Sequence, residues 1–101
     1  MRQLDVYLGE SLIGRIVENR KGGRFEYEQS IVGKLAGRPV LSMAFPAKVR
    51  PFGEAKTSAW FNGLLPEGNR RDEVCRSLGV LPYDWIGLLA EIGWECAGAV
   101  R

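Results

Sequence analysis

The stretch TSAWFNGLLPEG, residues 57–68, marks the point at which the pattern of this sequence changes, and it decides the expected fold. Four large apolar residues in it would cover more of a helix than one core-facing stripe needs: Trp60, Phe61, Leu64 and Leu65. Pro66 and Gly68 then interrupt the run. Because Ser58 is a suitable N-cap, the stretch predicts a short helix that ends at a corner before Pro66.

Before this stretch, apolar and polar residues alternate, which is the period of half-buried strands. Residues 2–8, 11–18 and 24–28 are predicted strands of an antiparallel meander, with Gly22 and Gly23 in its second hairpin turn. Residues 38–46 alternate again and predict a further strand.

Two segments between these strands have different patterns. Residues 29–37 predict one or two turns of helix, with Ser30 as its cap and Gly37 at its end. Residues 47–57 contain a proline, a glycine and mixed charge, which predicts an exposed loop of the kind that often carries function.

After the stretch, apolar residues recur with the period of helices. One predicted helix covers residues 66–79, with Val74, Cys75 and Leu78 on its apolar face and Gly79 at its end. A second covers residues 82–93, with Tyr83 and Asp84 near its start and the following apolar stripe: Trp85, Leu88, Leu89 and Ile92. Residues 96–101 open a short last strand.

These elements predict an α+β fold, an antiparallel sheet of about four or five strands packed with two or three C-terminal helices. With 101 residues, we expect the chain, residues 1–101, to form a single domain around one core. Its 46% hydrophobic and 26% charged residues are ordinary for a globular domain and argue against disorder or a membrane span. Asp5 and Glu10 interrupt the segment that a signal peptide would need, so we expect a cytoplasmic protein.

The groups that most enzymes need are missing from the sequence. It has no histidine, so it holds no Ser-His or Cys-His pair, and it has no glycine-rich phosphate-binding motif. Cys75 and Cys96 are spaced unlike a zinc site, and we expect both to be reduced and largely buried; a disulfide between them is the alternative. By elimination, the chain is expected to be a binding module without metal, cofactor or catalytic residues.

Three ordered segments carry a resemblance to a known family: GRPVLSMAFP (37–46), WFNGLLPEGNRRDEVCRSLGV (60–80) and DWIGLLAEIGWECAGAV (84–100). They resemble the small N-terminal subdomain of HipA-type serine/threonine kinase toxins, over nearly the whole chain. In the tripartite HipBST modules, a short kinase, HipT, lacks this subdomain, and a small protein, HipS, resembles it. The likeness implies a HipS-like antitoxin that binds and inhibits a HipT-like kinase. A ternary complex with a HipB-like DNA-binding protein is left open.

The same stretch, 57–68, supplies the candidate contact residues. We expect Trp60, with Phe61 beside it, to enter or flank the cleft of the kinase, because tryptophan is enriched among residues that dominate binding energy. Leu64, Pro66, Glu67 and Arg70 are expected to frame this contact. The alternative is that Trp60 is a core residue and that Pro66 marks only a helix corner. Trp85 is expected in the core, and Trp94 in the core or at its rim.

Two other functions are compatible with the sequence. The chain could be an excised N-terminal subdomain of a larger HipA-type kinase, with no inhibitory activity of its own. It could instead bind nucleic acid through Arg20, Lys21 and Arg24, although a net charge of +2 gives little support to this function and the cluster is typical of a solvated hairpin turn. Binding to membranes is not expected.

Overall fold

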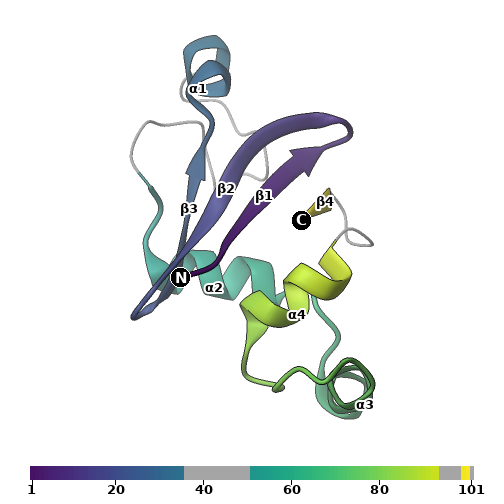
Figure 1. The fold of residues 1–101 in the computed structure, drawn as a ribbon. Helices are drawn as coiled ribbons and strands as arrows, with labels where there is room; N and C mark the ends of the chain where they lie inside the picture. The colour runs from purple at the N-terminus through teal and green to yellow at the C-terminus, as the bar shows by residue number, and fades with distance from the viewer. Residues whose placement is uncertain (36–50, 94–98, 101) are drawn as a thin grey trace.

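The computed structural model of the chain describes residues 1–35, 51–93 and 99–100. In chain order its elements are β1 (Gln3–Leu8), β2 (Ser11–Asn19), β3 (Gly22–Tyr27), α1 (Gln29–Leu35), α2 (Glu54–Asn62), α3 (Gly68–Leu78), α4 (Trp85–Ile92) and β4 (Ala99–Val100). Three antiparallel strands are followed by four helices and by the short β4. In Figure 1, α1 lies above the sheet, and α2, α3 and α4 lie beside and below it. The predicted α+β class is therefore confirmed.

The sheet has four strands in the order β3-β2-β1-β4, and every neighbouring pair is antiparallel. The short last strand pairs with the first, through Val6 with Val100 and Tyr7 with Ala99. Sequence position and position in the sheet therefore differ, because β4 lies beside β1 rather than beside β3. The strand predicted at 38–46 lies outside the described residues.

The second hairpin turn is displaced from the predicted glycines. Its two turn residues are Arg20 and Lys21, while Gly22 already pairs with Asn19 as the first residue of β3. The Asn19 side-chain oxygen accepts a hydrogen bond from the Lys21 backbone N–H at 2.9 Å, an interaction that favours turns at asparagine. Gly22, just after the turn, has a φ of 126°, a backbone conformation that glycine adopts readily because it has no Cβ atom.

A register shift interrupts the pairing of β1 with β2. Val6 pairs with Gly14 and Tyr7 with Leu12, which leaves Ile13 as one extra residue in β2. Ile13 and Gly14 are both buried although they are adjacent in the strand. Gly14 is required there, since a Cβ atom would lie 2.9 Å from atoms of the Phe25 ring.

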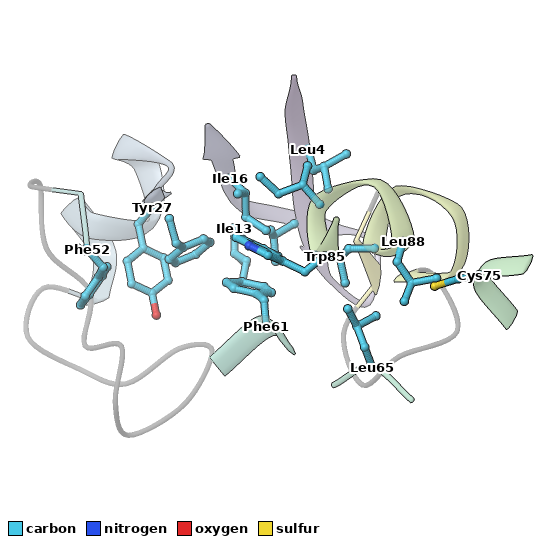
Figure 2. Packing of buried hydrophobic residues seen from close by; sticks show 14 of the residues in the cluster. Leu4, Ile13, Ile16, Tyr27, Phe52, Phe61, Leu65, Cys75, Trp85 and Leu88 are labelled. Atoms are coloured by element: carbon cyan, nitrogen blue, oxygen red, sulfur yellow. The ribbon is translucent and has the colours of Figure 1, made fainter. Parts of the chain in front are cut away.

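The core lies between one face of the sheet and helices α2 and α4. Aromatic rings form its centre: the Phe25 centroid lies 4.8 Å from that of Tyr27 and 5.7 Å from that of Phe61. Phe61 also stacks on Trp85 of α4 at 6.4 Å, and Figure 2 shows these rings between the strands and the helices. The expectation that Trp85 belongs to the core is confirmed, because its side chain is buried.

The outer edge of β3 is partly closed by the residues before and within α2. The Phe52 N–H donates to the Phe25 carbonyl oxygen at 2.8 Å, and the Phe25 N–H donates to the hydroxyl of Thr57 at 3.1 Å. Thr57 is fully buried, and Phe52 is 3% exposed. The prediction of an exposed loop over residues 47–57 is therefore wrong for its second half, where Phe52 enters the core and α2 begins at Glu54.

Three charged side chains link the sheet to the start of α4. Arg2 donates to Glu18 of β2 at 2.7 Å and to Asp84 at 2.8 Å. Asp84 is the N-cap of α4, and its carboxylate accepts a hydrogen bond from the Gly87 backbone N–H at 3.2 Å. The hydrogen bond from Arg2 lowers the pKa of Asp84, and hydrogen bonds from Arg2 lower that of Glu18 to about 2.

Several predicted helix details need correction. Ser30 and Ser58 lie inside α1 and α2, so neither is the cap: Glu28 precedes α1 and Gly53 precedes α2. On α3, Cys75 is buried and carries a free thiol, but Leu78 is 40% exposed. Gly79 ends α3 in the left-handed conformation, as predicted. Gly37, Trp94 and Cys96 lie outside the described residues.

Candidate partner-binding surface

Trp60 lies in the last turn of α2, where its ring is only partly covered. It is half-buried, and its ring meets that of Phe61 edge-on, with centroids 4.9 Å apart and an interplanar angle of 81°. Its inner side thus packs against the core, while part of its surface faces solvent. Trp60 was expected to be either a core residue or a contact residue. Its burial is compatible with both, because one side of the ring packs against the core and the other is accessible.

Phe61 needs a correction, because it is 0% exposed. Its ring lies among Phe25, Trp60 and Trp85, so it has no surface through which it could touch a partner. The helix leaves Trp60 near solvent and turns Phe61 inward, since adjacent residues on a helix point about 100° apart. Phe61 therefore packs against the inner side of the Trp60 ring and is not itself accessible to a partner.

The corner between α2 and α3 brings the other predicted residues next to Trp60 along the chain. Leu64 and Pro66 are half-buried at this corner, whereas Leu65 is buried in the core. The N–H of Leu64 donates to the Phe61 carbonyl oxygen at 3.2 Å, and that of Leu65 to the Asn62 carbonyl oxygen at 3.0 Å. Two tight turns thus follow α2, and α3 starts only at Gly68, with a φ of 58°.

One interaction across this corner was not foreseen. Arg71 of α3 donates from Nη1 to the side-chain oxygen of Asn62, the last residue of α2, at 3.0 Å. Arg71 is half-buried, and its Nε is a buried donor without an acceptor in the part of the chain that the structure describes. No sequence signal pairs these two residues, because they lie on different helices.

Comparison with known proteins decides the family of this chain. The family model described as "HipA N-terminal domain" matches residues 4–101. The chain belongs to the HipA N-terminal domain family. This HipA N-terminal domain is also 30% identical over 102 residues to Y4mE of Sinorhizobium fredii (strain NBRC 101917 / NGR234), a protein described as a kinase. The match covers 100% of the chain and 24% of Y4mE, so the domain spans about a quarter of the length of this relative.

Two charged residues complete the predicted surface of the HipA N-terminal domain. Glu67 and Arg70 are both exposed, Glu67 just before α3 and Arg70 in its first turn. Glu67 occupies the N-cap position, but its side chain makes no capping hydrogen bond. These two charges therefore face solvent beside the half-buried apolar groups of the corner.

The three cations of the β2–β3 hairpin gather around a carboxylate. The Nε of Arg24 lies 3.3 Å from Glu54, and the Asn19 amide donates to the same carboxylate at 3.0 Å. A hollow of about 390 Å³ is lined by these residues together with Arg20 and Lys21. The pKa of Glu54 is lowered, first by its own backbone N–H and then by the Asn19 amide, so Glu54 is anionic at neutral pH.

Other possible sites of the HipA N-terminal domain lie away from this corner. A hollow of about 500 Å³ beside α1 is lined partly by Arg15, Glu26 and Glu28, and Arg15 forms ion pairs with both glutamates. Within residues 1–35, 51–93 and 99–100, no group of histidine, cysteine or acidic side chains could hold a metal ion. No helix in these ranges is long and apolar enough to cross a membrane.

Proposed function

We propose that this chain is a HipS-like antitoxin, which binds a HipT-like serine/threonine kinase and neutralises it without catalytic activity or cofactor of its own. The observation that carries the proposal is the partly exposed ring of Trp60 at the α2–α3 corner of a HipA N-terminal domain. Tryptophan is enriched among the few residues that carry most of the binding energy of protein interfaces. The similarity to Y4mE, a protein described as a kinase, supports a kinase as the partner.

In this proposal, Trp60 inserts into or covers the active-site cleft of the kinase. Phe61 and Trp85 lie behind it in the core, so little conformational freedom is lost when Trp60 is bound. Leu64 and Pro66 extend the apolar contact, and Glu67 and Arg70 form its charged rim. Rim charges of this kind influence association rate and specificity more than affinity.

The partners of the chain are then proteins. We propose the kinase as the direct partner and a HipB-like DNA-binding protein as a third member of the complex, with no direct contact to nucleic acid or membrane. All three proteins would meet in the cytoplasm. This arrangement follows from the likeness to the tripartite modules.

Co-expression with a HipT-like kinase tests the proposal. The wild-type chain should restore growth and copurify with the kinase, and Trp60→Ala should lose both while remaining folded. Losing a central anchor typically costs ~2 kcal/mol or more, which is about 30-fold in Kd. Tyr83→Ala is the matched control, because Tyr83 is an aromatic residue that is 79% exposed outside the corner. A wild-type chain that neither rescues growth nor binds would refute the antitoxin proposal.

A second candidate function is supported by the relationship to Y4mE, in which the matched region forms 24% of a longer protein. The chain would then be the N-terminal subdomain of a larger HipA-type kinase and would have no separate inhibitory role. An immunoblot of the source cells separates the two candidates. A band near 11.2 kDa supports a separate antitoxin, whereas a band several times larger supports a subdomain.

A further inference from the structure

The candidate contact surface lies on a segment whose two ends are joined by a side-chain hydrogen bond. Arg71 Nη1 donates to Asn62 Oδ1 at 3.0 Å, so the pair closes residues 62–71 into one loop. Leu64, Pro66, Glu67 and Arg70 all lie inside this loop. Trp60 lies two residues before it, in the last turn of α2. The pair therefore restrains the corner, and this corner contains all of the proposed contact residues except Trp60.

Other interactions also restrain this corner, since Leu64 packs against the core at the corner and Val74 does so from α3. Two turn hydrogen bonds, at 3.2 and 3.0 Å, follow α2, and a longer one at 3.4 Å joins the Arg71 N–H to the Glu67 carbonyl oxygen. Leu65 is the buried residue of the corner, and Cys75 is the buried residue of α3. Because α3 buries Cys75 and only partly buries Val74, the Asn62–Arg71 hydrogen bond is an additional restraint on the direction of α3 relative to α2.

The pair is an unfavourable choice if its purpose were stability alone. Arg71 Nε is buried and has no acceptor in the described ranges, and an unpaired buried donor is costly. Replacing both partners of such a pair with apolar groups of similar shape is usually close to neutral for stability. The Asn62–Arg71 hydrogen bond should thus add little stability, but it fixes the position of α3 relative to the end of α2. This points to a role in orienting the corner.

We infer that Asn62 and Arg71 are a positioning pair, which holds the α2–α3 corner so that Trp60, Leu64 and Pro66 face the kinase together. This inference rests on the proposed function, because it describes how the same surface is prepared for its partner. Without the pair, α3 would pivot on its short contact with the core, and the contact residues would no longer share one surface.

The test is a double variant, Asn62→Leu with Arg71→Met, which removes both polar partners and keeps their approximate volume. Its melting temperature should stay within about 4 °C of the wild-type value, since a larger shift in a domain of this size would report a substantial loss of stability. Its affinity for the kinase used in the co-expression experiment should fall by at least about tenfold, measured by titration calorimetry. Asn62→Asp keeps an acceptor and adds charge complementarity to Arg71, so it should bind like the wild type.

A matched control exists at the other end of the same helix. Asn19 donates to Glu54 at 3.0 Å, another amide that bonds a charged side chain on a different element. Asn19→Leu with Glu54→Met should leave kinase affinity unchanged, because this pair lies at the start of α2 and Trp60 at its end. If both double variants weaken binding equally, the effect is not one of positioning and the inference is overturned.

A spectroscopic readout separates positioning from general destabilisation. In protein labelled with 5-fluorotryptophan, the ¹⁹F resonance of Trp60, assigned with Trp60→Phe, should shift or broaden in Asn62→Leu/Arg71→Met. The resonance of the buried Trp85 should stay in place. An unmoved Trp60 signal with wild-type affinity would overturn the inference alone, while Trp60→Ala would still test the antitoxin function. A wild-type chain without affinity for the kinase would overturn both.

Discussion

Trp60 and Phe61 are adjacent in the sequence, but Phe61 is fully buried and Trp60 is half-buried. Replacing each of them should therefore change the stability of the fold by a different amount. Phe61→Ala removes a fully buried ring from the centre of the core and should lower the free energy of unfolding by about 3–5 kcal/mol. Trp60→Ala removes a half-buried ring and should cost less than half as much. Urea denaturation followed by circular dichroism measures both values. Equal costs for the two variants would show that Trp60 is a core residue and would remove it from the candidate surface.

At these residues the sequence could not predict which side chains are buried. The run Trp60, Phe61, Leu64 and Leu65 indicated that some apolar side chains would be left outside the core. It could not indicate which, because the choice depends on where α2 begins and on how it lies against Phe25. Arg71 shows the same limit for polar groups. Its acceptor, Asn62, becomes a neighbour only when the corner brings the two helices together.

At the scale of elements, alternation located the first three strands and helical periodicity located α3 and α4, because each pattern follows from the geometry of the element alone. The start of α2 was missed because Pro51, Phe52 and Gly53 have the composition of a loop. Phe52 and Thr57 instead bond to the edge of β3, about thirty residues earlier in the chain. A contact between such distant segments leaves no local pattern.

The β2–β3 hairpin supports a prediction about nucleic acid. Glu54 offsets part of the charge of Arg20, Lys21 and Arg24, so the hairpin should contact too few phosphates to bind heparin at physiological salt. The wild-type protein should elute from a heparin column well below ~0.15 M salt, the physiological ionic strength. Glu54→Gln should elute later, because it removes the carboxylate among the cations. Firm retention of the wild type, lost in Arg20→Gln/Lys21→Gln, would favour the nucleic-acid function.

At the scale of the whole molecule, Arg2, Glu18 and Asp84 join the first strand, the second strand and the last helix. The pKa values of both carboxyl groups are lowered in the folded chain, that of Glu18 to about 2 from 4.5. The stability that the two ionised carboxylates add to the folded chain is therefore fully present above about pH 4.5, and it is lost as the pH falls towards 2. All three side chains are partly exposed, so about 1 kcal/mol for each ion pair is expected.

Arg2→Ala tests this contribution through the melting temperature measured at several pH values between 7 and 2. The variant should be less stable than the wild type at pH 7, and the difference should shrink on acidification through the window in which the carboxyl groups titrate. Arg20→Ala is the control, since Arg20 is exposed and forms no ion pair with the described residues. A difference that stays constant down to pH 2 would mean that Arg2 acts by packing and not by charge.

The pairing of β4 with β1 has a consequence for how the chain is made. Val6 is synthesised well before its partner Val100, which is the last of the described residues to be added. At about 5–20 residues per second, roughly 5 to 20 seconds separate the two events. During this interval one edge of β1 lacks its partner strand and is open to pairing with other nascent chains on the same messenger RNA. The sheet is therefore complete only after β4 has been synthesised.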